Sequence, residues 1–373
     1  MRPQERKEGF ANVIKTDLAN CMDCYRCVRA CPVKAISVTR GQANVMDSLC
    51  VQCGTCVHEC PQKAKLIVSE IDRVKELIAS GRKVACSIAP SFPAAFPGWQ
   101  SNRIPSALRR LGFCYVSETA EGASLIAAAS IQTAQRGRIF TACPAVVNYV
   151  ELYRPEYIDC LVDVVSPMLA HSKMLREKLG SDIAVVFIGP CAAKKQEARR
   201  EENRDYVQAV LTFSELLQWF EEEDIDLSTC TESDFQREID YRDARLFPIQ
   251  GGMIKTCGLK DDVDYSEVIH VSGFKQIKEL FDTPQNEWPF RFAEPLFCEG
   301  GCIGGPGFPK EESIFKRKLA VQEYVDSFSE FAGANREPSL DLKTHFSPRQ
   351  REFCFEMVRE EDIEAVLVET GKA

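Results

Sequence analysis

The sequence has no basic stripe and no long apolar run. Its 46 Lys and Arg residues stand against 55 Asp and Glu, a net charge of −9, and binding to a phosphate backbone needs clustered positive charge. Nucleic acid is therefore a poor candidate partner. No apolar run approaches the roughly 20 residues that span a bilayer, and the start, MRPQERKEGF, lacks the apolar core of a secretory signal. We therefore expect a cytoplasmic protein without membrane contact.

Cysteine, in contrast, is plentiful, with 18 residues in a chain of 373. In a secreted protein this number would suggest disulfides, but a reducing cytosol favours metal ligation or redox chemistry. The chain is long enough for two or three domains. Because eight of the cysteines fall between Cys21 and Cys60, we expect a small module with a linker helix over 1–80. A main domain over 81–330 and a charged, mostly helical extension over 331–373 would follow.

The front cysteines form the motif C-x2-C-x2-C-x3-C-P twice. Three thiolates spaced in this way can wrap one face of an iron-sulfur cube, while the fourth, beside proline, completes the other cube. Zinc is the alternative, but tetrahedral zinc usually takes its ligands as two separated pairs. The pattern predicts two 4Fe4S clusters, one held by Cys21, Cys24, Cys27 and Cys60 and the other by Cys50, Cys53, Cys56 and Cys31. Over residues 15–68 the sequence resembles bacterial two-cluster ferredoxins, which implies an α+β fold and electron transfer.

Behind this module, apolar runs rich in β-formers alternate with helical patterns. The spacing predicts helices over 68–81, 166–180 and 213–225, and strands over 82–90, 112–118, 137–143, 182–190, 205–212 and 266–273. This alternation is typical of parallel βα units around a buried sheet. Several of the strands end at residues discussed below, where open α/β sheets bind their ligands.

Four more cysteines follow predicted strands or lie among glycines. They are Cys143 in TACPA, Cys191 in FIGPCAAKKQEA, and Cys298 and Cys302 in EPLFCEGGCIGGPG. Proline interrupts the strand, and glycine lets the main chain pass close to a bulky group. Buried free cysteines often pack as small hydrophobes, which explains any one of the four but poorly explains a C-x3-C flanked by glycines. The pattern indicates a large buried cofactor.

These segments resemble the three signature motifs of the iron-only (FeFe) hydrogenases, over roughly residues 82–325. The resemblance implies an α/β catalytic domain of two lobes of parallel βα units around a buried cofactor. This H-cluster is a 4Fe4S cube joined to a two-iron unit with CO, cyanide and a dithiolate bridge. It implies that Cys143, Cys191, Cys298 and Cys302 hold the cube, with Cys302 as the bridge. The substrates would be H2 and protons, and electrons would pass through the front clusters.

The same resemblance assigns further positions. Lys194 falls where the family places a lysine that bonds a cyanide, a sensible partner for an anion, and Glu197 fits the carboxylate that pairs with it. By itself, the pair Lys194-Lys195 would more often be solvated. Glu294 fits the acid that opens the third motif. The walls of the two-iron unit would include Ala89, Pro90, Ser91, Pro167, Met168, Gly189, Pro190, Phe247 and Leu296.

The sequence also departs from the family. The first motif usually has two adjacent cysteines, of which the first relays protons, and here that position is Ala142. The segment 124–134, where the acidic proton path should fall, has no carboxylate. Gly189 and Leu296 replace methionines, and Met168 replaces a glutamine. Because positioned proton transfer is worth about a hundred- to ten-thousand-fold in rate, we expect slow hydrogen chemistry, as in the sensory subgroup of the family.

Three functions stay open at this point. One is a low-activity hydrogenase that reports hydrogen or redox state to a ferredoxin-like redox partner or a downstream signalling protein. The second is a fully active hydrogenase with another proton path, and the third is a hydrogenase-like iron-sulfur assembly protein. His171, one of four histidines, could serve such a path, although a lone histidine in a helix is more often structural. Cys257 is a second candidate relay, and the other spare cysteines are expected in the core: Cys86, Cys114, Cys160, Cys230 and Cys354.

Overall fold

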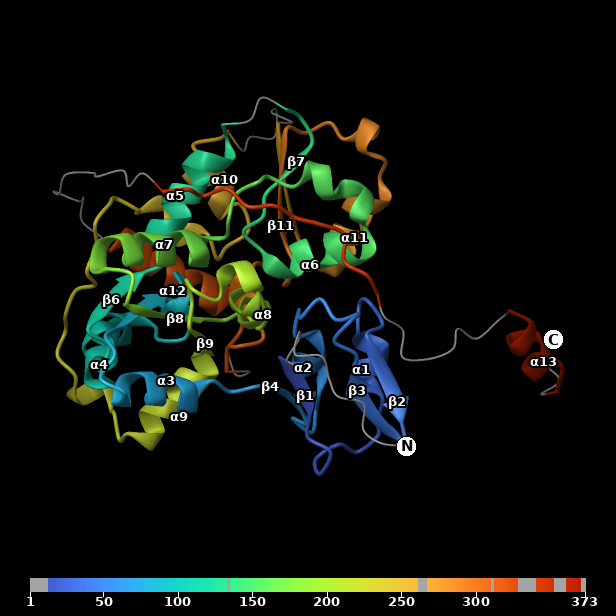
Figure 1. Cartoon of the computed structure of the whole chain (residues 1–373), viewed down its shortest axis with the longest axis horizontal. Helices are drawn as coiled ribbons and strands as arrows, with labels where there is room; N and C mark the ends of the chain where they lie inside the picture. The colour runs from blue at the N-terminus through green and yellow to red at the C-terminus, as the bar shows by residue number, and fades with distance from the viewer. Residues whose placement is uncertain are drawn as a thin grey trace.

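The computed structural model describes residues 13–132, 135–260, 267–309, 312–327, 340–351 and 360–369. A small front module lies beneath a larger α/β body, and the last helix, α13 (Glu360–Glu369), lies apart from both (Figure 1). Residues 340–351 cross the body in an extended conformation, so the described part of the C-terminal extension is only partly helical. No helix in the described ranges is long and apolar enough to cross a bilayer.

The front module contains two short antiparallel strand pairs and two one-turn helices. β1 (Ile14–Thr16) pairs with β4 (Lys65–Ile67), and β2 (Ile36–Thr39) pairs with β3 (Gln42–Val45). The helices α1 (Arg26–Ala30) and α2 (Thr55–Glu59) each end just before the last cysteine of a motif. The sulfur of Cys31 accepts a hydrogen bond from the backbone N–H of Ala35, and that of Cys60 from Ala64. The two halves of the module therefore repeat in structure as they do in sequence.

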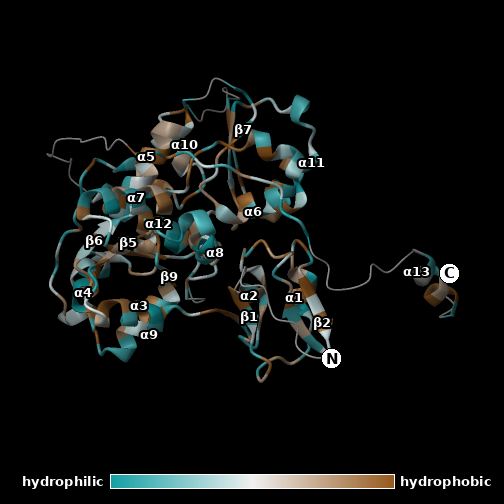
Figure 2. Cartoon of the chain, in the orientation of Figure 1, coloured by the Kyte–Doolittle hydropathy of each residue, from teal (hydrophilic) through white to brown (hydrophobic). Residues whose placement is uncertain are grey.

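The larger lobe of the body is built on a parallel sheet of four strands in the order β6-β5-β8-β9. These strands are β5 (Val84–Ile88), β6 (Tyr115–Glu118), β8 (Ala184–Gly189) and β9 (Ala209–Thr212), and all of their residues are buried. Complete burial explains why the strands read as unbroken apolar runs, because helices cover both faces of such sheets. Hydrophobic residues follow the strands through the interior in Figure 2. The helices of this lobe are α3 (Ile71–Ala79), α4 (Ile104–Arg110), α5 (Ala120–Ser130), α7 (Pro167–Leu179), α8 (Ala193–Arg199), α9 (Phe213–Glu222), α10 (Gly252–Thr256) and α12 (Ile314–Asp326).

The smaller lobe has a parallel sheet in the order β10-β11-β7. Its strands are β7 (Arg138–Ile139), β10 (Val268–Ser272) and β11 (Phe292–Leu296), and its helices are α6 (Pro144–Tyr153) and α11 (Phe274–Asp282). The two-lobed α/β architecture and the ferredoxin-like front module confirm the fold class expected from the sequence.

Three strands differ from the sequence-based prediction. β7 is only two residues long and β9 begins at Ala209, whereas β11 was not predicted at all. Its sequence FAEPL contains proline, which is usually excluded from central strands. β11 pairs with β7 only through Phe292 and Ala293, so Pro295 lies where one side of the strand has no partner strand.

Candidate active site

The carboxyl ends of the strands in the two lobes meet around one buried cavity of about 80 Å³. Ala89, Pro90 and Ser91 follow β5, Thr119 follows β6, and Pro190 and Cys191 follow β8. From the smaller lobe, β11 contributes Glu294, Pro295 and Leu296. A water-sized group needs roughly 10–15 Å³ of such space, so the cavity has room for a small polyatomic group.

The four distant cysteines converge beside this cavity. Cys143 caps the N-terminus of α6, Cys191 lies two residues beyond β8, and Cys302 opens a short 3-10 turn after β11. Burial raises the pKa of the Cys191 thiol to about 12, and the nearby Cys143 raises it further. Burial likewise raises the pKa of Cys298 well above its usual range, and the nearby thiols of Cys191, Cys143 and Cys302 raise it further. Four thiols from three separate segments therefore lie close enough to interact with one another.

Glycines in the third motif allow the chain segments to approach this closely. Gly301 has a φ of 98°, and a Cβ there would lie 2.4 Å from the carbonyl oxygen of Pro248. A Cβ at Gly305 would lie 2.7 Å from the carbonyl oxygen of Pro190. A side chain at either position would push the third motif away from the segments around Pro248 and Pro190, so the backbone of these segments packs directly around the cysteines.

Lys194 extends from the start of α8 to the cavity wall. Its ammonium donates to Glu197 Oε2 at 2.7 Å and reaches the carbonyl oxygen of Ala142 at 3.5 Å. The side chains of Lys194 and Glu197 are 8% and 12% exposed. Its neighbour Lys195 is fully buried and donates to the Val210 carbonyl and to Glu215. The alternative that Lys194 and Lys195 are a solvated pair does not hold, because α8 packs against β9 and buries both side chains.

The predicted wall residues lie around the cavity, with one exception. Ala89, Pro90, Ser91, Pro167, Met168, Pro190, Phe247 and Leu296 line it, together with Ala142. Gly189 does not, since a Cβ there would lie 2.7 Å from the ring of Phe187, which lines the cavity instead. The hydroxyl of Ser91 is buried and has no hydrogen-bond partner among the described residues. This cavity therefore offers a spare donor beside an ammonium and four thiols, a set that fits an anionic metal cofactor.

The front cysteines lie close enough to one another to interact. Burial raises the pKa of Cys50 well above its usual range, and the neighbouring thiols of Cys53, Cys56 and Cys31 raise it further. Burial also raises the pKa of Cys27, and the thiols of Cys60 and Cys24 add to this rise. In the described ranges, no three or more His, Cys, Asp or Glu side chains are placed to hold a single metal ion.

The front module contacts the body at the third cysteine motif. A Cβ on Gly54 would lie 2.4 Å from the ring of Pro306, and His58 Nε2 lies 3.2 Å from the carbonyl oxygen of Gly304. Cys53 is among the thiols that raise the pKa of Cys298. The second group of front cysteines therefore lies next to the cysteines of the body.

The acids around the cavity differ from the sequence-based expectation. No carboxylate occurs in 124–134, as noted, but Glu121 precedes this segment in the first turn of α5 and is fully buried. Its Oε2 lies 3.3 Å from His171 Nε2. Glu294 lies on the cavity wall and accepts from the backbone N–H of Met253. Sequence analysis missed Glu121, Thr119 and Met253, because only the tertiary packing brings them to the site.

Of the spare cysteines, Cys86, Cys160 and Cys230 are buried as expected, whereas Cys114 is exposed and Cys257 is half-buried. Cys257 donates weakly to the Ala127 carbonyl at 3.6 Å, and burial followed by Glu294 raises its pKa to about 12. Cys354 lies outside the described residues.

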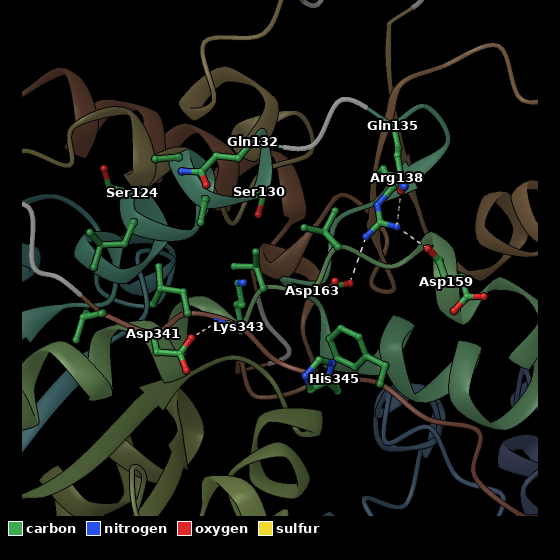
Figure 3. Close-up of a pocket in the computed structure, with 18 of the residues that line it drawn as sticks. Ser124, Ser130, Gln132, Gln135, Arg138, Asp159, Asp163, Asp341, Lys343 and His345 are labelled. Carbon is green, nitrogen blue, oxygen red and sulfur yellow. Dashed lines mark hydrogen bonds and ion pairs between the residues drawn. The ribbon is translucent and has the colours of Figure 1, made fainter.

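A second, open pocket of about 1060 Å³ lies on the outer side of α5 (Figure 3). Ser124 and Ser130 line it from α5, and the extended segment 340–346 crosses it. Arg138 is held there by Gln135 and Asp163 and by the carbonyls of Asp159 and Leu161. None of the site residues predicted from the sequence lines this pocket.

Comparison with known proteins agrees with this geometry. The model of the iron only hydrogenase large subunit, C-terminal domain, matches residues 82–306, more than half of the chain. A 4Fe-4S dicluster domain matches residues 13–61. The chain is 27% identical to the NADP-reducing hydrogenase subunit HndD of Solidesulfovibrio fructosivorans over 420 residues, which covers 90% of this chain and 71% of that protein.

Two further likenesses are weaker. Over 107 residues, 29% of this chain and 20% of the relative, the sequence is 29% identical to the cytosolic Fe-S cluster assembly factor NAR1 of Vanderwaltozyma polyspora. A structure of a variant of the [FeFe]-hydrogenase HydA1 from Chlamydomonas reinhardtii matches the fold with a TM-score of 0.56 and 18% identity, covering 75% of this chain and 99% of that one. The match of the catalytic-domain model to most of the body decides the assignment: this chain belongs to the iron-only hydrogenase family and carries a 4Fe-4S dicluster domain ahead of the hydrogenase domain.

Proposed function

We propose that this protein is a slow iron-only hydrogenase that interconverts H2 with two protons and two electrons and reports hydrogen or redox state. The observation that carries the proposal is the convergence of four cysteine thiols beside an apolar cavity whose wall has a methyl group at Ala142. The cysteines support cofactor binding, and the methyl group supports restricted proton supply.

In this proposal each metal group has its own set of thiols. Cys143, Cys191, Cys298 and Cys302 hold the H-cluster, with Cys302 as the bridging ligand, and the front cysteines hold two 4Fe4S clusters in the sets given above. When bound, the H-cluster supplies the redox chemistry between hydrogen and protons. The domain limits proposed are 1–80, 81–330 and 331–373.

The protein's own residues orient and isolate this cofactor. The Lys194 ammonium, held by Glu197 at 2.7 Å, donates to an anionic ligand on the two-iron unit, and the free Ser91 hydroxyl offers a second donor. Met168, Phe247 and Leu296 exclude water from the cavity. Because charges interact more strongly in a dry site, one buried ammonium has a large effect on an anion there.

Electrons reach the site through the front module. Cys53 belongs to the proposed second cluster and lies near Cys298, and the close contact of Gly54 with Pro306 fixes this arrangement. The electron partner is then a ferredoxin-like protein or a downstream signalling protein that contacts the front module.

Proton supply is the slow step in this proposal. A methyl group at Ala142 cannot accept or release a proton, and a positioned acid or base contributes about a hundred- to ten-thousand-fold in rate. A protein with slow turnover and an intact electron path suits a reporter of hydrogen better than a bulk catalyst, and this supports the sensory role.

Infrared spectroscopy of maturated protein, combined with hydrogen turnover measurements, tests the proposal. CO and cyanide bands with turnover well below that of active members of the family are the expected result. Turnover comparable to theirs would favour a fully active hydrogenase with another proton path. Absence of the bands would overturn the proposal in favour of the assembly role, which the name of the relative NAR1, a cytosolic Fe-S cluster assembly factor, states for that protein.

A further inference from the structure

A buried polar chain connects α5, α7 and the larger sheet close to the cavity. His171 on α7 and Glu121 on α5 are both fully buried. His171 Nδ1 lies 2.7 Å from the hydroxyl of Ser87 on β5, and its Nε2 lies 3.2 Å from the hydroxyl of Ser117 on β6 and 3.3 Å from Glu121 Oε2. Both ring nitrogens therefore have partners, which a histidine that only fills space in the core does not need.

The close crossing of α5 and α7 explains how these two side chains meet. A Cβ at Gly122 would lie 2.3 Å from the Pro167 carbonyl oxygen and 2.6 Å from the backbone nitrogen of His171. Only glycine permits this distance, so the neighbouring residue Glu121 is brought directly to the imidazole. The pair is thus built into the helix packing.

The inner end of the chain lies on the cavity wall. The Ser87 hydroxyl lies 2.7 Å from that of Thr119, and Thr119 lines the cavity together with Ala142 and Lys194. Hydroxyl groups at hydrogen-bond distance can pass a proton by exchanging donor and acceptor roles. His171, Ser87 and Thr119 are therefore linked in series by hydrogen bonds up to the cavity. Glu121 Oε2 lies 3.3 Å from the other ring nitrogen of His171 and makes no hydrogen bond of its own among the described residues.

The outer end approaches the open pocket of Figure 3. Glu121 Oε1 accepts from the backbone N–H groups of Glu238 and Ile239. Ile239 lines that pocket, and so does Ser124, one turn along α5 from Glu121 (Figure 3). The backbone of residues 238–239 thus lies between Glu121 and the open pocket.

The other buried acid in this region is not suited to the same task. Glu118 accepts from the Arg245 guanidinium and from the hydroxyls of Tyr241 and Tyr324. An arginine keeps its charge at all working pH values, and it is the ion-pair partner of Glu118 at 2.8 Å. Glu121 instead faces the imidazole of His171, whose two ring nitrogens can donate and accept hydrogen bonds.

We propose that Glu121, His171, Ser87 and Thr119 form a proton relay that partly replaces the thiol missing at Ala142. In one passage, protonated Glu121 gives its proton to His171 Nε2 while the proton on Nδ1 moves to Ser87, the Ser87 proton to Thr119, and the Thr119 proton into the cavity. Before the next passage, Glu121 takes up a proton from the side of the open pocket and the imidazole returns to the tautomer with its proton on Nδ1. At each step one N–H or O–H bond breaks and another forms, with no change in oxidation state. The relay rests on the proposed hydrogenase function.

The test uses maturated full-length protein, with hydrogen evolution normalised to the infrared bands of the loaded site. Thr119→Val removes a hydroxyl at nearly constant volume, and His171→Leu removes the imidazole. Each should lower the rate by about tenfold or more and raise the solvent deuterium isotope effect. The expected loss starts below the full contribution of positioned proton transfer, about a hundred- to ten-thousand-fold, because the relay replaces the missing thiol only partly. Thr119→Ser, which keeps the hydroxyl, should retain more of the rate than Thr119→Val.

The matched control is Ser172→Ala. Ser172 is also fully buried on α7, but its hydroxyl donates to the Met168 carbonyl and contacts none of the relay groups. If Thr119→Val left the rate, the isotope effect and the infrared bands unchanged, the relay would be overturned and the hydrogenase proposal would stand. An equal loss in Ser172→Ala would overturn it as well, because the effect would then come from packing. Absence of CO and cyanide bands in the unaltered protein would overturn the hydrogenase proposal and the relay together.

Discussion

Replacing Lys194 with methionine separates its role toward the cofactor from its role in stability. The ammonium lies 2.7 Å from Glu197 Oε2, with both side chains nearly buried. Removing one partner of a buried pair leaves an uncompensated charge and costs about 3–5 kcal/mol. We expect about 3 kcal/mol here, because Arg200 is close enough to interact with Glu197 and partly compensates its charge.

The loss of cofactor binding is a separate effect of the same change. A hydrogen bond from a charged donor contributes about 1.5–3 kcal/mol, so Lys194→Met should weaken retention of an anionic two-iron unit roughly 10- to 150-fold. Glu197→Gln keeps the ammonium and is the matched variant. It should lose stability but keep the unit.

The assay compares infrared CO and cyanide band intensity, relative to 4Fe4S content, with the midpoint of thermal unfolding. The expected result is loss of bands in Lys194→Met and retention in Glu197→Gln, while both unfold at lower temperature than the unaltered protein. Equal band loss in the two variants would refute the reasoning, since the lysine would then act only through the stability of the pair.

Three further changes test other parts of the structure. Ala142→Cys should raise the hydrogen-evolution rate about tenfold or more; an unchanged rate would contradict the idea that the methyl group limits turnover. Lys65 is buried and its charge lowers the pKa of both Cys27 and Cys56. Lys65→Met should therefore lower the reduction potentials of the front clusters by on the order of tens of millivolts, measured by a redox titration followed by electron paramagnetic resonance, and unchanged potentials would contradict it. Gly122→Ala should cost about 1–3 kcal/mol of stability because its Cβ would overlap α7; an unchanged unfolding midpoint would show that the helices adjust freely.

The sequence predicted the parts of the site that are encoded locally. The cysteine motifs and the runs that form β5 and β8 are each contained in one short segment, so their spacing alone indicated ligands and strands. Lys194 was predicted through its neighbours in FIGPCAAKKQEA. The burial of Lys195 was not, because it depends on α8 packing against β9.

The polar chain at His171 could not be predicted for the same physical reason. Glu121 and His171 are 50 positions apart, and their contact depends on the space that Gly122 leaves between α5 and α7. In the sequence, Ser87 and Thr119 are ordinary residues at strand ends. Only the parallel pairing of β5 with β6, which aligns Ser87 with Ser117, places the hydroxyls on the same side of the sheet as the imidazole.

The electron and proton sides of the proposed site differ in how fully they are built. On the electron side, Gly54 and Pro306 are in such close contact that no side chain fits between them, and Cys53 lies beside Cys298. On the proton side, the thiol position is a methyl group, and the buried acid Glu121 is connected to the cavity through an imidazole and two hydroxyls. Under the proposed function, proton delivery limits the rate, and the redox state of the clusters comes to equilibrium with hydrogen without fast turnover. Such a balance is what a sensor of hydrogen needs, because its output is the state of its clusters and not the amount of product.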